Sequence, residues 1–116
     1  MAPGALIEVC RSGDLVDGGA GVRFVAGASP REDAAFVVRY RGQAFGFRNR
    51  CAHVPMELDW VEGSFFDAAG ERLVCATHGA AYDPASGVCI EGPCVGRRLQ
   101  ALAIIERDGV VYWTAT

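Results

Sequence analysis

The stretches of sequence that decide how this chain folds are Cys51-Ala52-His53 and Cys75-Ala76-Thr77-His78. Each stretch pairs one thiol with one imidazole, and residues 54–74 separate the two pairs. The chain has no other histidine. Ligands spaced this closely belong to one loop, and two such loops can close over a metal centre. We therefore interpret four residues as one set of metal ligands: Cys51, His53, Cys75 and His78.

The order of these ligands bears on the kind of metal centre. A Cys2His2 zinc site usually takes both cysteines from one half of its motif and both histidines from the other half. In this chain each half contains one of each. Two cysteines on one iron and two histidines on the other are the ligands of a Rieske [2Fe–2S] cluster. We therefore expect one [2Fe–2S] cluster per chain, with the cysteines on one iron and the histidines on the other, and we consider zinc the less favoured alternative.

Length, charge and hydropathy restrict the functions open to this chain. Its 116 residues, of which 51% are hydrophobic, predict a single domain over residues 1–116. The net charge of −3 and the lack of a basic run argue against nucleic-acid binding. No apolar run approaches the roughly 18 residues of a membrane span, and no signal peptide is visible. We expect a cytoplasmic protein, because cysteines in a reducing compartment serve metals more often than disulfides.

Short apolar runs separated by glycine and acidic residues predict an all-β fold. The expected strands cover residues 6–10, 22–25, 35–40, 44–48, 73–75, 99–106 and 110–114. Turns are expected at 41–43, 67–70 and 108–109, and no amphipathic helix of 10 or more residues is evident. Residues 49–94 carry every candidate ligand and few long strands. We expect them to form a cluster-binding subdomain within a β framework made by both ends of the chain.

The sequence resembles the Rieske ferredoxin family over residues 49–94, and more loosely over the whole chain. The matching stretches are 49–53 (NRCAH), 75–83 (CATHGAAYD), Ser86-Gly87, Gly92-Pro93 and Leu99. The two ligand loops are highly specific to the family, whereas the flanking strands are not. The resemblance implies a Rieske-like β-sandwich with a small rubredoxin-like subdomain that binds the cluster. It also implies a soluble carrier of single electrons, similar to the ferredoxin components of oxygenase systems.

Departures from the high-potential members of that family bear on the reduction potential. A disulfide joins the two ligand loops in those members, and its positions correspond here to Met56 and Thr77, which implies that the disulfide is absent. A serine that donates to a bridging sulfide corresponds to Ala80, and a tyrosine that donates to a cysteine sulfur corresponds to Tyr82. Fewer donors stabilise the reduced cluster less, so we expect a low potential, tuned at Ala80 and Tyr82.

Three cysteines lie outside the ligand set. Cys10 is expected to be a buried, unreactive strand residue. Cys89 and Cys94 flank a short turn that can bring their sulfurs together. We favour a role as small apolar fillers beneath the cluster, and a disulfide or redox-active pair is the alternative. Apolar residues after the first motif are expected to screen the cluster or stiffen its loop, or in the case of the tryptophan to join the core: Pro55, Met56, Leu58 and Trp60.

We therefore expect an electron carrier rather than an enzyme, with redox proteins as partners and with no small-molecule substrate. The resemblance implies a flavin-dependent NAD(P)H reductase as the donor and an oxygenase as the acceptor. With 116 residues the chain is too short to contain either of those domains as well. One alternative is a small Rieske-like subunit of a larger oxidoreductase, similar to those of nitrite reductases; the presence of all four ligands favours the carrier. Another alternative is a redox sensor that uses the cluster or the Cys89 and Cys94 thiols.

Overall fold

The computed structural model describes residues 5–52, 56–77 and 79–115. The strands are β1 (Ala5–Arg11), β2 (Val22–Val25), β3 (Ala34–Tyr40), β4 (Gln43–Arg48), β5 (Leu73–Val74), β6 (Ala81–Tyr82), β7 (Cys89–Glu91), β8 (Ala101–Leu102), β9 (Ile104–Arg107) and β10 (Val110–Ala115). Within the described residues the only helix is η1 (Ser12–Asp14), of 3-10 type, and no helix there has the length and apolarity to cross a membrane. The predicted all-β class is confirmed.

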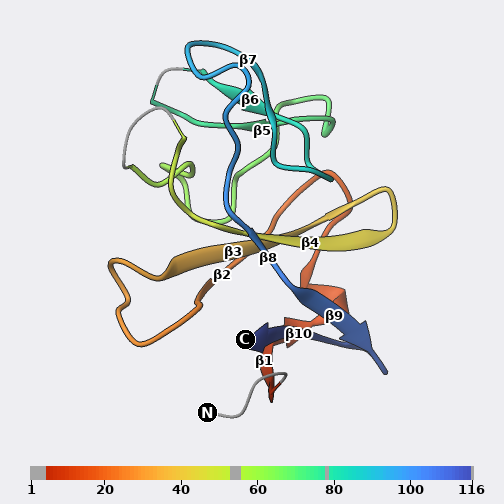
Figure 1. Ribbon diagram of the computed structural model, residues 1–116. Helices are drawn as coiled ribbons and strands as arrows, with labels where there is room; N and C mark the ends of the chain where they lie inside the picture. Colours follow the sequence, from red (N-terminus) through yellow and green to blue (C-terminus); the bar gives the residue numbers. More distant parts are fainter. Residues whose placement is uncertain (1–4, 53–55, 78, 116) are drawn as a thin grey trace.

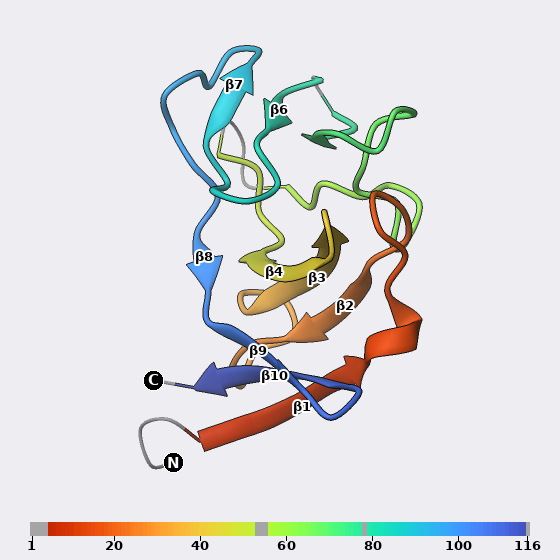
Figure 2. The same cartoon turned by 90° about the vertical axis from the view of Figure 1, so that its right-hand side faces the viewer.

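The strands form three antiparallel sheets, with the orders β1-β10-β9, β2-β3-β4-β8 and β5-β6-β7. The described ends of the chain lie beside the first sheet, and β5-β6-β7 lies at the opposite end of the molecule (Figure 1). The side view in Figure 2 shows the second sheet between the other two. The two loops with the predicted ligands therefore belong to the end of the molecule remote from the termini.

Strand β3 shows how the layers pack on one another. Its central residues Phe36, Val37 and Val38 are 0% exposed, because the sheet is covered on both faces. Side chains alternate along a strand. Phe36 and Val38 belong to the core shared with the ligand loops, whereas Val37 belongs to the core shared with the first sheet. Phe36 also stacks on Phe65 with ring centroids 4.0 Å apart, which joins the middle sheet to the segment between the two loops.

Two of the predicted turns are two-residue hairpin connections. Arg41 and Gly42 (φ 51° and 82°) join β3 to β4, and Asp108 and Gly109 (φ 52° and 78°) join β9 to β10. Positive φ at both central residues defines a type I′ turn, whose twist suits antiparallel strands. Asp17 fixes the first turn, because its carboxylate accepts hydrogen bonds from the N–H groups of Arg41 and Gly42 at 2.9 and 2.7 Å.

The strand predicted over residues 99–106 is wrong in one respect, because it is two strands in different sheets. Strand β8 pairs with β4, whereas β9 pairs with β10, so the chain changes sheet at Ala103. Ile104 then packs closely on Gly46, where an added Cβ atom would lie 2.5 Å from the isoleucine side chain. Gly46 thus permits the crossing. Gln43, predicted within a turn, begins β4, and the short strands β6 and β7 were not predicted.

Candidate functional site

The first ligand loop leaves the end of β4 and carries Cys51. This residue is buried, and its N–H donates to the Met56 carbonyl at 2.8 Å. The hydroxyl of Tyr82, on β6, lies 3.1 Å from the Cys51 sulfur. The predicted ligand His53 and the neighbouring Pro55 lie outside the described residues. The structure therefore places one predicted thiol ligand in the core, in contact with a second strand.

A buried carboxylate that the sequence analysis missed supports this loop. Asn49, two residues before the cysteine, accepts a hydrogen bond from Leu58 N–H and donates its side-chain amide to Asp59, both at 2.9 Å. Asp59 is 2% exposed and also accepts two bonds from the Arg23 guanidinium, at 2.8 and 2.9 Å, and one from Gly63 N–H at 2.9 Å. The network joins β2, the end of β4 and the segment after the loop, so it holds the base of the loop in position.

The charge on Asp59 makes this support dependent on pH. Burial raises the pKa of Asp59, but hydrogen bonds from Arg23, Asn49 and Gly63 outweigh burial, and the pKa lies below its ordinary value of 3.8. A carboxylate whose pKa is lowered by folding stabilises the folded state above its unfolded pKa, and this stability is lost as the pH falls through the folded pKa. We expect Asp59→Asn to lower the free energy of unfolding by about 1–3 kcal/mol at neutral pH.

Guanidinium denaturation followed by circular dichroism measures this effect. The difference in free energy of unfolding between wild type and Asp59→Asn should be constant around neutral pH. It should become smaller below pH 3.8, where the wild-type carboxylate takes up its proton. Asp108→Asn is a suitable control, because it changes an exposed acid in a hairpin turn where asparagine also accepts positive φ. A difference that stays the same below pH 3.8 would show that the charge of Asp59 is not what stabilises the loop.

The second ligand loop joins β5 to β6 and carries Cys75, which follows β5 and does not belong to it. Cys75 is 0% exposed, its N–H donates to the Ala80 carbonyl at 2.9 Å, and its own carbonyl accepts a bond from Gly79 N–H at 3.0 Å. Gly79 has a φ of 71°, which glycine adopts without strain. His78 lies outside the described residues. The second predicted thiol ligand thus lies at the buried base of a tight turn.

The two ligand loops touch each other. Ala76 N–H donates to the Leu58 carbonyl at 3.1 Å, and the Thr77 hydroxyl donates to the Met56 sulfur at 3.9 Å. Met56 and Thr77 are the two positions at which the family resemblance implied a missing disulfide. A weak contact between a hydroxyl and a thioether therefore joins the loops at this point, in place of a covalent bond.

Tyr82 lies between three polar groups in the core. It is 0% exposed, and its hydroxyl oxygen accepts a hydrogen bond from Ala52 N–H at 3.0 Å. The same hydroxyl lies 3.1 Å from the Cys51 sulfur and 3.4 Å from the Cys94 sulfur. Burial, together with the neighbouring thiols of Cys51 and Cys94, raises the pKa of Tyr82 far above its ordinary value. The hydroxyl therefore keeps its proton and is available as a donor to sulfur.

The environment of the two thiols suits a metal centre. Burial raises the pKa of Cys75; the Thr77 backbone N–H lowers it, and the adjacent Cys51 thiol raises it again. Two neighbouring buried thiols ionise readily only when a cation compensates their charge, and a coordinated metal ion deprotonates a thiol outright. No group of three potential metal ligands is found among the described residues, which include neither histidine. The two predicted thiol ligands, Cys51 and Cys75, nevertheless lie next to each other in the structure.

Ala80 and Gly92 mark where the turn after β7 packs on the second loop. Ala80 is fully buried. Gly92 has a φ of 99°, and a Cβ atom at this position would lie 3.0 Å from the Ala80 Cα atom. Only glycine therefore allows this approach without strain. The close packing places Cys89 and Cys94 in the same core cluster as the two predicted thiol ligands.

A basic groove of about 780 Å³ runs beside Cys51. Its lining includes four arginines and three carboxylates: Arg31, Arg48, Arg50, Arg98, Glu32, Asp33 and Glu57. Arg48 is paired with Asp33 at 3.0 Å, whereas Arg31, Arg50 and Arg98 are exposed. Arg97 extends the basic region, because its guanidinium donates to the Ala52 carbonyl at 3.5 Å. A chain with a net charge of −3 thus presents cationic groups beside the first ligand loop.

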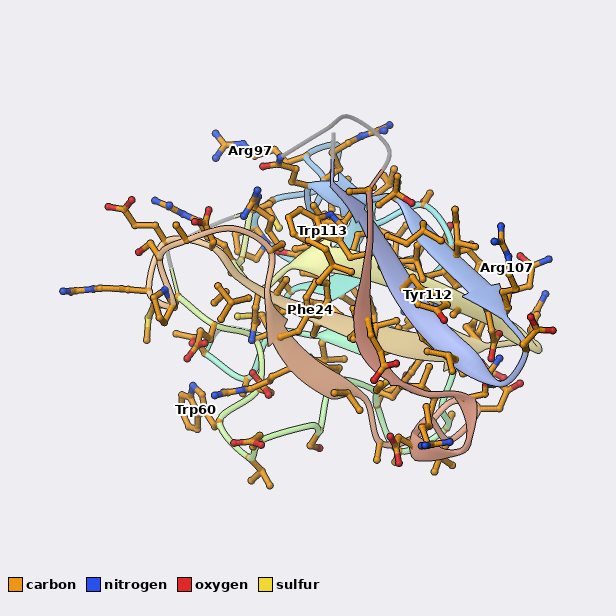
Figure 3. All side chains as sticks on the ribbon, turned by 90° about the horizontal axis from the view of Figure 1, so that it is seen from below. Phe24, Trp60, Arg97, Arg107, Tyr112 and Trp113 are labelled. Atoms are coloured by element: carbon orange, nitrogen blue, oxygen red, sulfur yellow. The ribbon has the colours of Figure 1, made fainter. Side chains whose placement is uncertain are left out.

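Trp60 differs from the expectation that it joins the core. It is 69% exposed, and the next residue, Val61, is 72% exposed. Figure 3 shows the Trp60 side chain projecting from the edge of the molecule. Leu58, which is 0% exposed, occupies the core at this point, and the bend that follows turns Trp60 outward. Met56 is also exposed, so it does not shield the loop completely.

Comparisons with known proteins agree with this architecture. The family model described as "Rieske [2Fe-2S] domain" matches residues 5–110. The ferredoxin of Sphingomonas yanoikuyae B1 is similar with a TM-score of 0.75 and 21% identity, over 97% of this chain and 100% of that chain. The ferredoxin of carbazole 1,9a-dioxygenase from Nocardioides aromaticivorans IC177 has a TM-score of 0.75 and 20% identity, over 97% and 99%.

A third similar chain belongs to the complex of reduced oxygenase and oxidized ferredoxin in carbazole 1,9a-dioxygenase. It has a TM-score of 0.75 and 25% identity, over 97% of this chain and 94% of that chain. No curated protein matches this sequence. The likenesses at 20 and 21% identity establish the fold of the chain and nothing finer. The family model matches nearly the whole length of the chain.

Proposed function

Because the chain belongs to the Rieske [2Fe–2S] domain family, we propose that it is a ferredoxin that carries single electrons between larger redox proteins. The observation that carries this proposal is the pair of buried thiols, Cys51 and Cys75, on two loops that touch each other. Two similar structures that are named as ferredoxins support it, because the match to this chain covers 100% and 99% of their residues. We place the protein in the cytoplasm, where these thiols remain reduced.

In this proposal Cys51 and Cys75 bind one iron, His53 and His78 bind the other, and residues 49–94 form the part of the chain that binds the cluster. A [2Fe–2S] cluster with this ligand set accepts and releases one electron at a time. Cys51 and Cys75 lie on loops closed by backbone hydrogen bonds, which limits their movement when the charge changes. Tyr82 donates its hydroxyl proton to the Cys51 sulfur, and Ala80 leaves the corresponding position on the second loop without a donor.

The proposed donor is a flavin-dependent NAD(P)H reductase, and the proposed acceptor is an oxygenase. Support for the acceptor comes from the similar carbazole 1,9a-dioxygenase complex, which contains both an oxygenase and a ferredoxin. The basic groove beside Cys51 supports docking to an acidic surface, because complementary charge steers two proteins together. Electrons pass between proteins, so the chain itself needs no substrate pocket.

The composition of the purified protein tests the cofactor. We expect about two irons and two sulfides per chain, and a red-brown colour, after anaerobic purification. Addition of a reductase and NAD(P)H should bleach this colour, and addition of an oxygenase should restore it. A colourless protein with one zinc ion would contradict the proposal, and a cluster that copurifies only within a large oxidoreductase would indicate a subunit and not a free carrier.

Charge reversal at the groove tests the docking face. Arg98→Glu is expected to lower the bimolecular rate of electron transfer to the oxygenase by about tenfold at low ionic strength, because it replaces attraction by repulsion. The deficit should shrink as salt is added. Arg107→Glu makes the same change on β9, and Figure 3 shows Arg107 on a different side of the molecule from Arg97. Stopped-flow absorbance measures the rates, and equal effects of both variants would show that net charge alone is responsible.

A further inference from the structure

Two cysteines outside the ligand set are poised to form a bond. Cys89 is the first residue of β7, and Cys94 lies in the turn that follows. Their sulfurs are 2.7 Å apart, and the two residues are 1% and 2% exposed. A disulfide bond is about 2.05 Å long, so a small movement would join them.

The backbone around the two thiols maintains this approach. Cys89 N–H donates to the Arg97 carbonyl at 2.7 Å, and Arg97 N–H donates to the Cys94 carbonyl at 2.9 Å. Gly92 and Gly96, with φ values of 99° and 93°, provide the left-handed conformations that fold the chain back on itself. The turn is therefore compatible with two free thiols and, after a slight shift, with a disulfide.

The same pair is connected to the first ligand loop. The Tyr82 hydroxyl lies 3.4 Å from the Cys94 sulfur and 3.1 Å from the Cys51 sulfur. Its oxygen also accepts the hydrogen bond from Ala52 N–H. One side chain thus joins the Cys89 and Cys94 thiols to the sulfur that we propose as an iron ligand, and a chemical change at Cys94 alters the surroundings of Cys51.

We propose that Cys89 and Cys94 form a reversible disulfide, made by exchange with a low-molecular-weight disulfide, and that Tyr82 transmits its formation to Cys51. One protein thiolate attacks the oxidant R–S–S–R and releases R–S⁻; the second attacks the resulting mixed disulfide and releases another R–S⁻. The S–S bond of the oxidant breaks and the bond between Cys89 and Cys94 forms. Two electrons pass to the oxidant, and the two thiol protons pass to the released thiolates. A small dithiol reverses the reaction.

Access to the buried sulfurs requires only local opening of the turn. Ile90 and Val95, which adjoin the two cysteines, are 46% and 64% exposed, so the turn lies at the surface. Burial, followed by the neighbouring Cys94 thiol, raises the pKa of Cys89 to about 11. Cys89 therefore rests in its thiol form and reacts slowly. In a reducing compartment the pair remains a dithiol until the concentration of small disulfides rises.

Oxidation of the pair changes the hydrogen bonds of Tyr82. In the dithiol, the Cys94 S–H group donates to the Cys89 sulfur at 2.7 Å, so toward Tyr82 the Cys94 sulfur is an acceptor that competes with the Cys51 sulfur for the hydroxyl proton. Formation of the disulfide draws the Cys94 sulfur toward Cys89 and weakens this competition. Stronger donation to Cys51 stabilises the reduced cluster more, and oxidation of the pair should therefore raise the midpoint potential.

Mass spectrometry of the cluster-loaded protein tests bond formation directly. Samples are incubated anaerobically with oxidised glutathione or with dithiothreitol and are then denatured in N-ethylmaleimide. The glutathione sample should lose two of its five alkylated sites. Cleavage at Asp and Glu separates Cys75, Cys89 and Cys94, and only the last two peptides should remain linked. Dithiothreitol should restore both sites.

Two variants are the controls for this measurement. Cys10→Ser should lose the same two alkylated sites on oxidation, whereas Cys94→Ser should not form the link. Five alkylated sites after oxidation, a persistent glutathione adduct or a different linkage would overturn the proposal.

The midpoint potential of the same two samples tests transmission through Tyr82. The oxidised wild type should have the higher potential, and Tyr82→Phe should remove the difference between the two samples. Equal wild-type potentials, or an undiminished difference in Tyr82→Phe, would overturn the role of Tyr82. The mass measurement does not depend on electron transfer, so it separates failure of this proposal from failure of the proposed carrier function.

Discussion

Replacing Cys51 or Cys75 by serine is expected to remove the cluster, so that the iron content falls from about two atoms per chain to nearly none. Each thiol lies at the buried base of its loop, and a serine hydroxyl is a much poorer ligand for the soft iron–sulfur centre. The melting temperature should fall as well, because binding of a structural metal centre contributes to folding. Iron and sulfide analysis, the visible spectrum and calorimetry measure these losses.

Cys10→Ser is the matched control for the thiol ligands. Cys10 is also buried, and burial, followed by the Asp14 charge, raises its pKa to about 11, but it belongs to the core between the first two sheets. This variant should keep its full iron content. His53→Cys and His78→Cys test the other ligands, because a thiolate in place of imidazole adds negative charge and should lower the potential of any cluster that remains. A wild-type spectrum and potential in one of the four ligand variants would exclude that residue as a ligand.

Removing the Tyr82 hydroxyl is expected to lower the midpoint potential by tens of millivolts. A hydrogen bond to sulfur favours the reduced, more negative cluster, and about 1.4 kcal/mol of such preference corresponds to about 59 mV for a one-electron couple. Tyr82→Phe keeps the buried ring and removes only the group that lies 3.1 Å from the Cys51 sulfur. Protein-film voltammetry at one pH measures the change. The wild-type midpoint itself should lie near the low end of the Rieske range, about −150 mV.

Ala80→Ser should have the opposite effect, since it adds a hydroxyl donor on the second ligand loop. The substitution is small, and Gly92 leaves no side chain opposite Ala80 that would block it. Tyr112→Phe is the control, because it removes a tyrosine hydroxyl on β10, in the sheet farthest from the ligand loops. A rise on Tyr82→Phe, or a wild-type midpoint well above zero, would show that other groups determine the potential.

Local features of this fold could be predicted from the sequence because they depend on short segments. The all-β class followed from alternation and from the spacing of turn residues. The hairpins at Arg41-Gly42 and Asp108-Gly109 followed from residue types that accept positive φ. The two ligand loops were located by the spacing of cysteine and histidine, and the structure brings the two thiols, Cys51 and Cys75, together. The assignment of all four ligands stays a prediction, since the structure does not describe His53 and His78.

Features that join distant segments were decided only by the tertiary structure. Arg23 and Asp59 form an ion pair although they are 36 residues apart. The only hint of this pair in the sequence was the position of an acidic residue within an apolar run. The family resemblance implied that Tyr82 contacts a cysteine sulfur, and its hydroxyl does lie 3.1 Å from the Cys51 sulfur. Its second contact, with Cys94, depends on how the loops pack and was not predicted.

The break between β8 and β9 shows the same limit. The sequence of residues 99–106 predicts one strand. Only the strand pairings, and the packing of Ile104 on Gly46, show that the chain crosses from one sheet to another within this range. The sequences of short strands do not determine which strand pairs with which, because the backbone hydrogen bonds are the same in every antiparallel pairing. The sequence alone therefore determined the turns and the candidate ligands, whereas side-chain packing between layers decided which buried groups lie beside them.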